Sequence, residues 1–248
     1  GISLGANVLA ARFYASGKHK EMSETVHTAI TLALISGIIM AFVGLVFSRL
    51  ALEIMGTPDN VIEHSTLYMR IYFLGMPFFM LYNYGAAILR AVGDTKRPLI
   101  FLIISGLANA CLNLLLVIVF HMGVAGVAIG TVVSQCISCI LVLRCLYCSE
   151  GSYQLRFSKL TIKSFYMKQI FQVGIPAGIQ STVINLSNAL LQSSVNSFGS
   201  IAKAGCTAAN NIYGILYVSV HSVPKYSMSF TSKNYGVSNK SRLDKVHL

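Results

Sequence analysis

Residues 99–120 read LIFLIISGLANACLNLLLVIVF, an apolar run that contains no Asp, Glu, Lys or Arg. A helix needs about 20 mainly apolar residues to cross the hydrocarbon core of a bilayer, so this run predicts a membrane-spanning helix. Its two amides, Asn109 and Asn113, are four residues apart and therefore share one face of that helix.

Similar uncharged windows lie on both sides of this run. They cover residues 29–47, 71–89, 122–143, 169–202 and 204–224, and each is long enough to cross a membrane. The opening run 1–11 is too short to span, so we expect a helix whose beginning lies outside this chain. The fold class predicted is an all-α polytopic membrane protein with about seven helices, as part of a larger protein.

The composition supports a hydrocarbon environment. Of 248 residues, 54% are hydrophobic and only 11% are charged, and the mean hydropathy is +0.66. Soluble domains carry about 25% charged residues, so this chain lacks the charge to coat a water-facing surface.

The positive charges alternate along the chain. The net charge is +11, and segments 12–24, 90–98, 144–168 and 233–248 hold 15 of the 19 lysines and arginines. Basic loops mark the cytoplasmic side of membrane proteins, so these four segments are predicted to be cytoplasmic and the protein to be a multi-pass plasma-membrane protein. The same pattern argues against a nucleic-acid partner and makes the lipid bilayer the expected surroundings.

One connection differs from the others in length and polarity. Residues 147–168 are polar and basic, whereas the link between the windows at Phe120 and Met122 is very short. We therefore expect a first lobe at 1–146, a cytoplasmic linker at 147–168 and the start of a second lobe at 169–248.

Polar residues within the windows are expensive in lipid and mark cavities or helix contacts. In the first lobe, Thr131 and Gln135 share a face of the helix that follows Asn109 and Asn113, and Tyr68 and Asn83 lie near Pro77; these six residues predict a polar pocket. In the second lobe two stripes follow helical spacing and predict a water-lined cavity, with interhelical hydrogen bonding as the alternative. The stripes are Ser181, Asn185, Asn188, Gln192 and Asn196, and then Tyr213, Tyr217 and His221.

Other patterns carry no site. The pairs Cys136/Cys139 and Cys145/Cys148 are too close together for a zinc ribbon, so no metal is expected. The glycines at 123, 126 and 130 follow no strand and indicate close helix packing rather than a phosphate loop. Neither an enzyme nor a bound cofactor is expected.

Several motifs resemble those of one transporter family. Five segments are similar to those of MATE (multidrug and toxic compound extrusion) transporters of the prokaryotic type. They are 90–98 (RAVGDTKRP), the amides Asn109 and Asn113, the run 123–135, the stretch 173–176 (VGIP) and the triplet 234–236 (NYG). The resemblance implies twelve helices in two lobes, of which this chain would hold the end of helix two through helix eight.

The resemblance also implies a function. It predicts export of organic, often cationic compounds or drugs in antiport with H+ or Na+, by alternating access. Carried over by position, Tyr68, Asn83, Asn109, Asn113, Thr131 and Gln135 would form the ion-coupling network, and the second-lobe stripes would line the substrate cavity. Asn113 stands where many members have Asp.

Two alternatives share parts of this pattern. A lipid or lipid-linked oligosaccharide flippase has the same architecture, but its cavity needs basic residues at membrane depth, where only Lys225 stands. A seven-helix receptor or sensor would need neither a basic linker nor an internal repeat such as the likeness of residues 12–18 (RFYASGK) to residues 233–239 (KNYGVSN). The sequence does not specify the oligomeric state.

Overall fold

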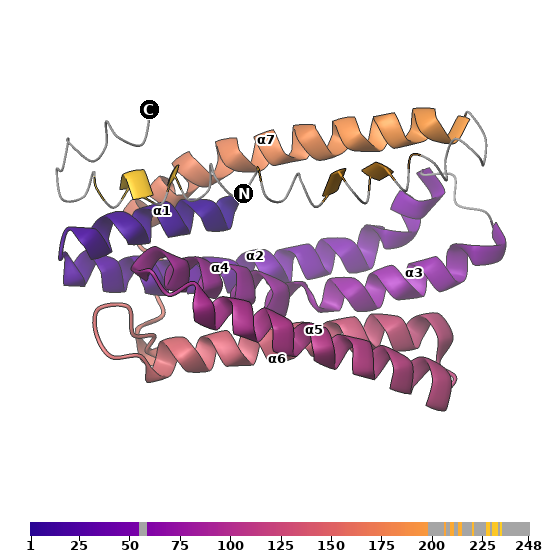
Figure 1. The fold of residues 1–248 in the computed structure, drawn as a ribbon, viewed down its shortest axis with the longest axis horizontal. Coiled ribbons are helices and arrows are strands. Elements are labelled where there is room, and N and C mark those ends of the chain that lie inside the picture. The colour runs from indigo at the N-terminus through magenta and orange to yellow at the C-terminus, as the bar shows by residue number, and fades with distance from the viewer. Residues whose placement is uncertain are drawn as a thin grey trace. The chain divides into compact units, whose positions relative to one another are not determined.

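The computed structural model describes residues 1–54 and 59–197, together with positions 206, 209, 210, 213, 214, 220, 227, 228, 230–232 and 234. The described elements are all helices, which confirms the predicted fold class (Figure 1). In chain order they are α1 (Ile2–Ala15), α2 (His19–Ile54), α3 (Asp59–Leu74), α4 (Met76–Val92), α5 (Lys96–Leu114), the π-helix η1 (Leu115–Val119), α6 (Gly123–Cys148), the 3-10 helix η2 (Phe157–Lys159) and α7 (Ser164–Ser197).

The motif at 90–98 is the turn between α4 and α5. Gly93 ends α4 in the left-handed region, with φ 100°, a conformation that glycine adopts without strain. Asp94 then accepts a hydrogen bond from the Arg97 backbone N–H at 3.1 Å, which satisfies one of the free donors at the start of α5. Gly93 therefore ends α4, and the Asp94 side chain stabilises the start of α5.

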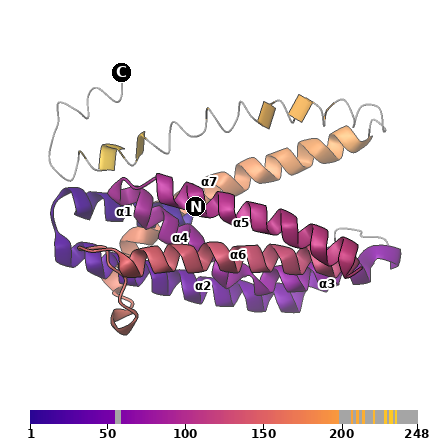
Figure 2. The ribbon, with the colours of Figure 1, turned by 60° about the horizontal axis from the view of Figure 1, so that its bottom comes forward.

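The chain divides into two compact units. One contains His19–Met167, and the other contains Gly1–Lys18 with Lys168–Leu248. In the first unit α2 packs against α3 and α4, and α6 packs against α3, α4 and α5. Figures 1 and 2 both draw α5 and α6 side by side. The division into lobes at 1–146, 147–168 and 169–248 stays a prediction.

Large apolar side chains cover the outside of the first unit. Phe42 on α2 is 67% exposed and Leu107 on α5 is 65% exposed, and neighbouring leucines and isoleucines on both helices are exposed as well. Such continuous apolar surface is unfavourable in water and is the face that a membrane helix turns to lipid. The protein is thus a multi-pass membrane protein.

The predicted spans can be compared with the described helices. Within the part of the chain that the structure describes, three helical segments are long and apolar enough to cross a bilayer: His19–Ile54, Lys96–Val119 and Gly123–Cys148. They contain the windows 29–47, 99–120 (except Phe120) and 122–143 (except Met122). The window 71–89 lies on a fourth, broken span, in which Val61–Leu74 and Met76–Val92 are bent by 43° at Gly75. The described part of α7 does not reach the same hydropathy, and most of the window 204–224 lies outside the described residues.

The connection between α6 and α7 is shorter than the predicted linker. It covers residues 149–163, because α6 continues to Cys148 and α7 begins at Ser164. Pro176 consequently lies inside α7 rather than near its start. The early start of α7 is supported by Tyr166, which donates a hydrogen bond to Glu24 on α2.

In the second unit, α1 and α7 approach each other through glycines. A Cβ at Gly5 would overlap the backbone of Ile170, and one at Gly174 would lie 2.7 Å from the Ile2 Cα. Gly1 and Gly5, like Gly174 and Gly178, are four residues apart, the small-residue spacing that lets membrane helices pack backbone to backbone.

Candidate polar site between α5 and α6

The short turn between η1 and α6 aligns the polar faces of α5 and α6. His121 and Gly123 both have positive φ, at 52° and 53°, so the chain reverses within a few residues. The reversal places α5 and α6 in antiparallel contact. The predicted amide face of α5 thereby meets the Thr131 face of α6.

Three of the predicted residues form a hydrogen-bonded cluster. The Asn113 Nδ2 donates to the Asn109 Oδ1 at 3.3 Å, and the Asn109 Nδ2 donates to the Thr131 Oγ1 at 3.5 Å. The Thr131 hydroxyl donates to the Val127 carbonyl at 2.9 Å, which leaves its oxygen free to accept from Asn109. The donating groups of Asn113, Asn109 and Thr131 in this series of hydrogen bonds therefore each have an acceptor.

The acceptors at the ends of the polar face are not satisfied. The Asn113 Oδ1 and the Gln135 Oε1 are buried and have no hydrogen-bond partner among the described residues. Buried polar atoms in native proteins are rarely left without a partner. Two unpartnered carbonyl oxygens beside one polar face are suited to a cation or to a ligand that donates a proton.

Glycines make room for both oxygens. The Asn113 Oδ1 lies against Gly130, where a Cβ would overlap it, and a Cβ at Gly75 would lie 2.5 Å from the Gln135 Oε1. Gly75 is the break between α3 and α4. Gln135 therefore brings the polar face of α6 against the bend of the neighbouring span.

The other two residues of the predicted network bond elsewhere. Asn83 donates to the Phe79 carbonyl of its own helix at 2.8 Å. Tyr68 stacks on Tyr72, with ring centroids 6.2 Å apart. No hydrogen bond between described residues joins either side chain to Asn109, Asn113 or Thr131. Their role in ion coupling stays a prediction.

The predicted substrate stripe is only partly described. Ser181, Asn185 and Asn188 are exposed on α7, and Ser181 donates to the Ala177 carbonyl of its own helix at 2.9 Å. Tyr213 is 61% exposed. The side chains of Gln192 and Asn196 and the residues Tyr217, His221 and Lys225 lie outside the described residues.

Two features of the site were missed by sequence reasoning. The π-helix η1 begins two residues after Asn113, and π-turns inside α-helices often occur at functional sites. The contact of Gln135 with the α3–α4 break is the second. Gly75 followed by Pro77 was a signal for the break, but nothing in the sequence pairs Gln135 with it.

The comparisons with known proteins agree with this architecture. The family model described as MatE matches residues 1–115. The chain is 31% identical to the probable multidrug resistance protein YoeA of Bacillus subtilis, over 99% of this chain and 55% of the relative. It is 24% identical to the multidrug export protein MepA of Staphylococcus haemolyticus, over 85% of this chain and 46% of the relative.

Solved structures show the same fold. A MATE transporter crystallised in a bent conformation matches with a TM-score of 0.87 at 20% identity, covering 99% of this chain and 55% of the other. An outward-facing MATE transporter matches with a TM-score of 0.85 at 19% identity, again with 55% of its length covered. The chain spans about half the length of the curated relatives it matches. Taken with the helical membrane fold and the polar face of α5 and α6, these matches confirm the resemblance of this chain to the MATE family of transporters.

Proposed function

We propose that the protein carrying this chain is a secondary active multidrug exporter, in which inward movement of H+ or Na+ drives outward movement of organic, often cationic compounds. The observation that carries the proposal concerns two buried oxygens inside a lipid-facing helix bundle, those of Asn113 and Gln135, which have no hydrogen-bond partner in the described part of the chain. The relative YoeA is a probable multidrug resistance protein, and the relative MepA is a multidrug export protein.

Alternating access requires that the ion and the drug prefer different conformations. A ligand shifts a conformational equilibrium only by as much as its affinity differs between the states. An ion held by the Asn113 Oδ1 would lie beside Gly130 on α6, and one held by the Gln135 Oε1 would lie beside the bend at Gly75. Because the bend belongs to a neighbouring span, a change in its angle would alter the ion site.

The transport assay uses everted membrane vesicles from cells that express the protein carrying this chain. Norfloxacin or ethidium uptake into the vesicles is followed after a proton gradient or a sodium gradient is imposed. We expect one of the two gradients to drive uptake and its collapse to stop uptake. Equal uptake with and without both gradients would contradict ion-coupled export.

The same vesicles distinguish a drug exporter from a lipid flippase. Translocation of a fluorescent lipid, measured by its accessibility to a membrane-impermeant quencher, should be no faster than in vesicles that lack the protein. Lipid translocation without gradient-driven drug uptake would replace the proposal with the flippase reading.

A further inference from the structure

The connection between α6 and α7 is folded against the first unit. Leu155 is fully buried, and its backbone N–H donates to the Leu146 carbonyl near the end of α6 at 3.0 Å. At the other end of the connection, the Lys163 backbone N–H donates to the Thr28 hydroxyl at 3.3 Å, and the Lys163 Nζ lies 3.9 Å from the Glu24 carboxylate. Residues 149–163 are therefore attached at both ends, which a simple tether between two bundles would not require.

His27 on α2 fixes the middle of the connection. Its Nδ1 lies 2.6 Å from the Ser23 carbonyl, which can only accept, so the proton is on Nδ1. Its Nε2 then accepts the Arg156 backbone N–H at 3.1 Å. The ring is 3% exposed and holds the backbone of Arg156 in one place.

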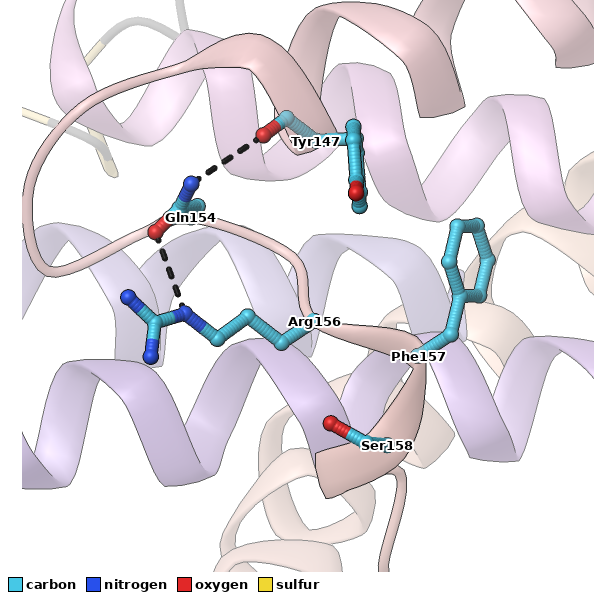
Figure 3. Close-up of a pocket in the computed structure, with 5 residues that line it drawn as sticks. All are labelled: Tyr147, Gln154, Arg156, Phe157 and Ser158. Carbon is cyan, nitrogen blue, oxygen red and sulfur yellow. Dashed lines mark hydrogen bonds between the residues drawn. The ribbon is translucent and has the colours of Figure 1, made fainter.

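Next to this attachment lies an open pocket of about 360 Å³, lined by Tyr147, Gln154, Arg156, Phe157 and Ser158. Figure 3 shows the two aromatic rings on one side and the Gln154 and Arg156 side chains on the other. The Arg156 Nε donates to the Gln154 Oε1 at 3.2 Å, and the Gln154 Nε2 donates to the Tyr147 carbonyl at 3.3 Å. The arginine is thus oriented through Nε, and its two terminal nitrogens have no partner among the described residues.

The chemistry of the pocket selects an anion. None of the five lining residues is acidic, and the free polar groups of Arg156 and Ser158 are a guanidinium and a hydroxyl, both of which can donate. A planar guanidinium matches two oxygens of a phosphate group at once. Tyr147 and Phe157 stack with centroids 5.9 Å apart and are more than half exposed, as aromatic residues often are at the level of lipid headgroups.

We propose that the connection pocket binds an anionic phosphate group, presented by an acidic phospholipid or by a soluble phosphate ester. The pocket follows directly after Cys148, the last residue of a membrane-spanning helix, which puts it within reach of headgroups on the predicted cytoplasmic side. The proposal is independent of what the protein transports.

The test uses native mass spectrometry of the purified, delipidated protein carrying this chain. Phosphatidylglycerol, phosphatidylcholine and glycerol 3-phosphate are titrated separately. We expect phosphatidylglycerol to bind more tightly than zwitterionic phosphatidylcholine, and Arg156→Gln to weaken its binding about tenfold, the loss of one charge-assisted contact. Lys159→Gln removes an equal, exposed charge close to the pocket and should change the affinity less than about twofold.

The soluble ester identifies the source of the phosphate. If glycerol 3-phosphate binds wild type but not Arg156→Gln, the pocket recognises the phosphate group itself. If phosphatidylglycerol binds and glycerol 3-phosphate does not, the ligand is a lipid whose acyl chains are also needed for binding. Equal weakening by Arg156→Gln and Lys159→Gln, or equal binding of phosphatidylglycerol and phosphatidylcholine, would overturn the proposal.

Two further variants keep the test independent of folding. Arg156→Lys retains the charge but not the planar fork, and His27→Ala retains every cation but frees the Arg156 backbone. We expect both to weaken phosphatidylglycerol binding at least about threefold while remaining monodisperse. Unchanged affinity in both variants would show that the fork and its orientation play no part.

Discussion

Asn113 is the residue with the most direct link to the proposed coupling. Its amide nitrogen donates to Asn109, and its amide oxygen is buried against Gly130 with no donor among residues 1–54 and 59–197 or the other described positions. A neutral amide cannot take up a proton near pH 7, so Asn113 can bind a cation or orient a proton-bearing partner but cannot carry the proton itself.

Replacing Asn113 by Ala should lower gradient-driven efflux about tenfold, because one interaction of the coupling network is removed. The amount of protein inserted in the membrane should stay unchanged. The measurement is initial-rate norfloxacin efflux normalised to the protein present in the membrane. Cys111→Ala, an exposed position on the same helix, is the matched control and should transport as wild type does. Equal rates for Asn113→Ala and wild type would remove Asn113 from the mechanism.

Gly130 tests the packing around the same oxygen. A Cβ at Gly130 would overlap the Asn113 Oδ1, whereas a Cβ at Gly106 on α5 meets nothing within 4 Å. Gly130→Ala should therefore displace the Asn113 amide from its hydrogen bond with Asn109 and destabilise the protein by about 1 kcal/mol. Gly106→Ala should be neutral or stabilise by up to about 1 kcal/mol, because alanine favours helix. Thermal unfolding in detergent compares the two, and equal melting temperatures would contradict the described contact.

At this scale the sequence could identify part of the site. The spacing of Asn109 and Asn113, and the short turn that follows them, predicted their contact with Thr131, whereas Gln135 lies against Gly75. The bond of Asn83 to the Phe79 carbonyl and the stacking of Tyr68 on Tyr72 could not be predicted, because helical spacing does not say whether a side chain makes its contacts within its own helix or with a neighbouring one. The hydrogen bond from the Arg156 backbone N–H to the His27 Nε2 could not be predicted either, because the two residues are far apart in sequence.

Among the helices, the contact between α1 and α7 depends on which glycines face the partner. A Cβ at Gly174 would lie 2.7 Å from the Ile2 Cα, whereas a Cβ at Gly178 would lie 3.8 Å from the Gly1 Cα, an ordinary contact. The two positions therefore differ in how much space α1 leaves.

Gly174→Ala should lower stability by about 1–3 kcal/mol, because the helices must move apart. Gly178→Ala adds the same methyl group on the same helix and should cost little or add some helical stability. The apparent melting temperatures of the two purified variants check this expectation. A larger loss for Gly178→Ala than for Gly174→Ala would show that α1 and α7 meet differently.

Tyr166 ties the start of α7 to α2. Burial, together with its hydrogen bond to Glu24 and the nearby carboxylates, raises the pKa of Tyr166 to about 12. The folded state therefore keeps this proton more tightly than the unfolded state, whose tyrosine pKa is about 10. The stabilisation is complete below about pH 10 and is lost as the pH rises toward about 12.

Tyr166→Phe should lower stability by about 1.5–3 kcal/mol at neutral pH, the value of a hydrogen bond to a charged group. Wild type should lose stability between about pH 10 and about pH 12, and the variant should lose less over that range. Chemical unfolding curves across this range test the expectation. Parallel pH dependence of the two proteins would show that Tyr166 does not respond to alkali in this way.

Helix existence was easier to predict than helix limits. Uncharged windows located α2, α5 and α6 because lipid-facing helices must be apolar along their whole length. The start of α7 at Ser164 was missed, because Lys163 and Lys168 read as part of a polar loop although Lys163 and Tyr166 bind α2. The π-turn η1 was missed because its residues, 115–119, are as apolar as any helix.

For the whole molecule, the predicted resemblance to the MATE family and the predicted membrane fold are both confirmed. The order of the motifs at 90–98, 109–113 and 123–135 was sufficient to predict the family, since each motif sits at a helix end or a helix contact where few residue types fit. The lobe boundaries and the coupling ion do not follow from these motifs. They depend on how complete bundles pack and on charges that a local pattern does not contain.

Antiport makes one demand on the whole transporter, because coupling between two ligands is reciprocal. If an ion gradient drives drug export, a drug gradient must also drive ion movement in the opposite direction. The measurement uses proteoliposomes that contain the protein carrying this chain, with no ion gradient at the start and norfloxacin on one side only. The account predicts that H+ or Na+ moves against the drug flow and that Asn113→Ala greatly reduces this movement. Norfloxacin that crosses at the wild-type rate while neither ion moves would contradict it.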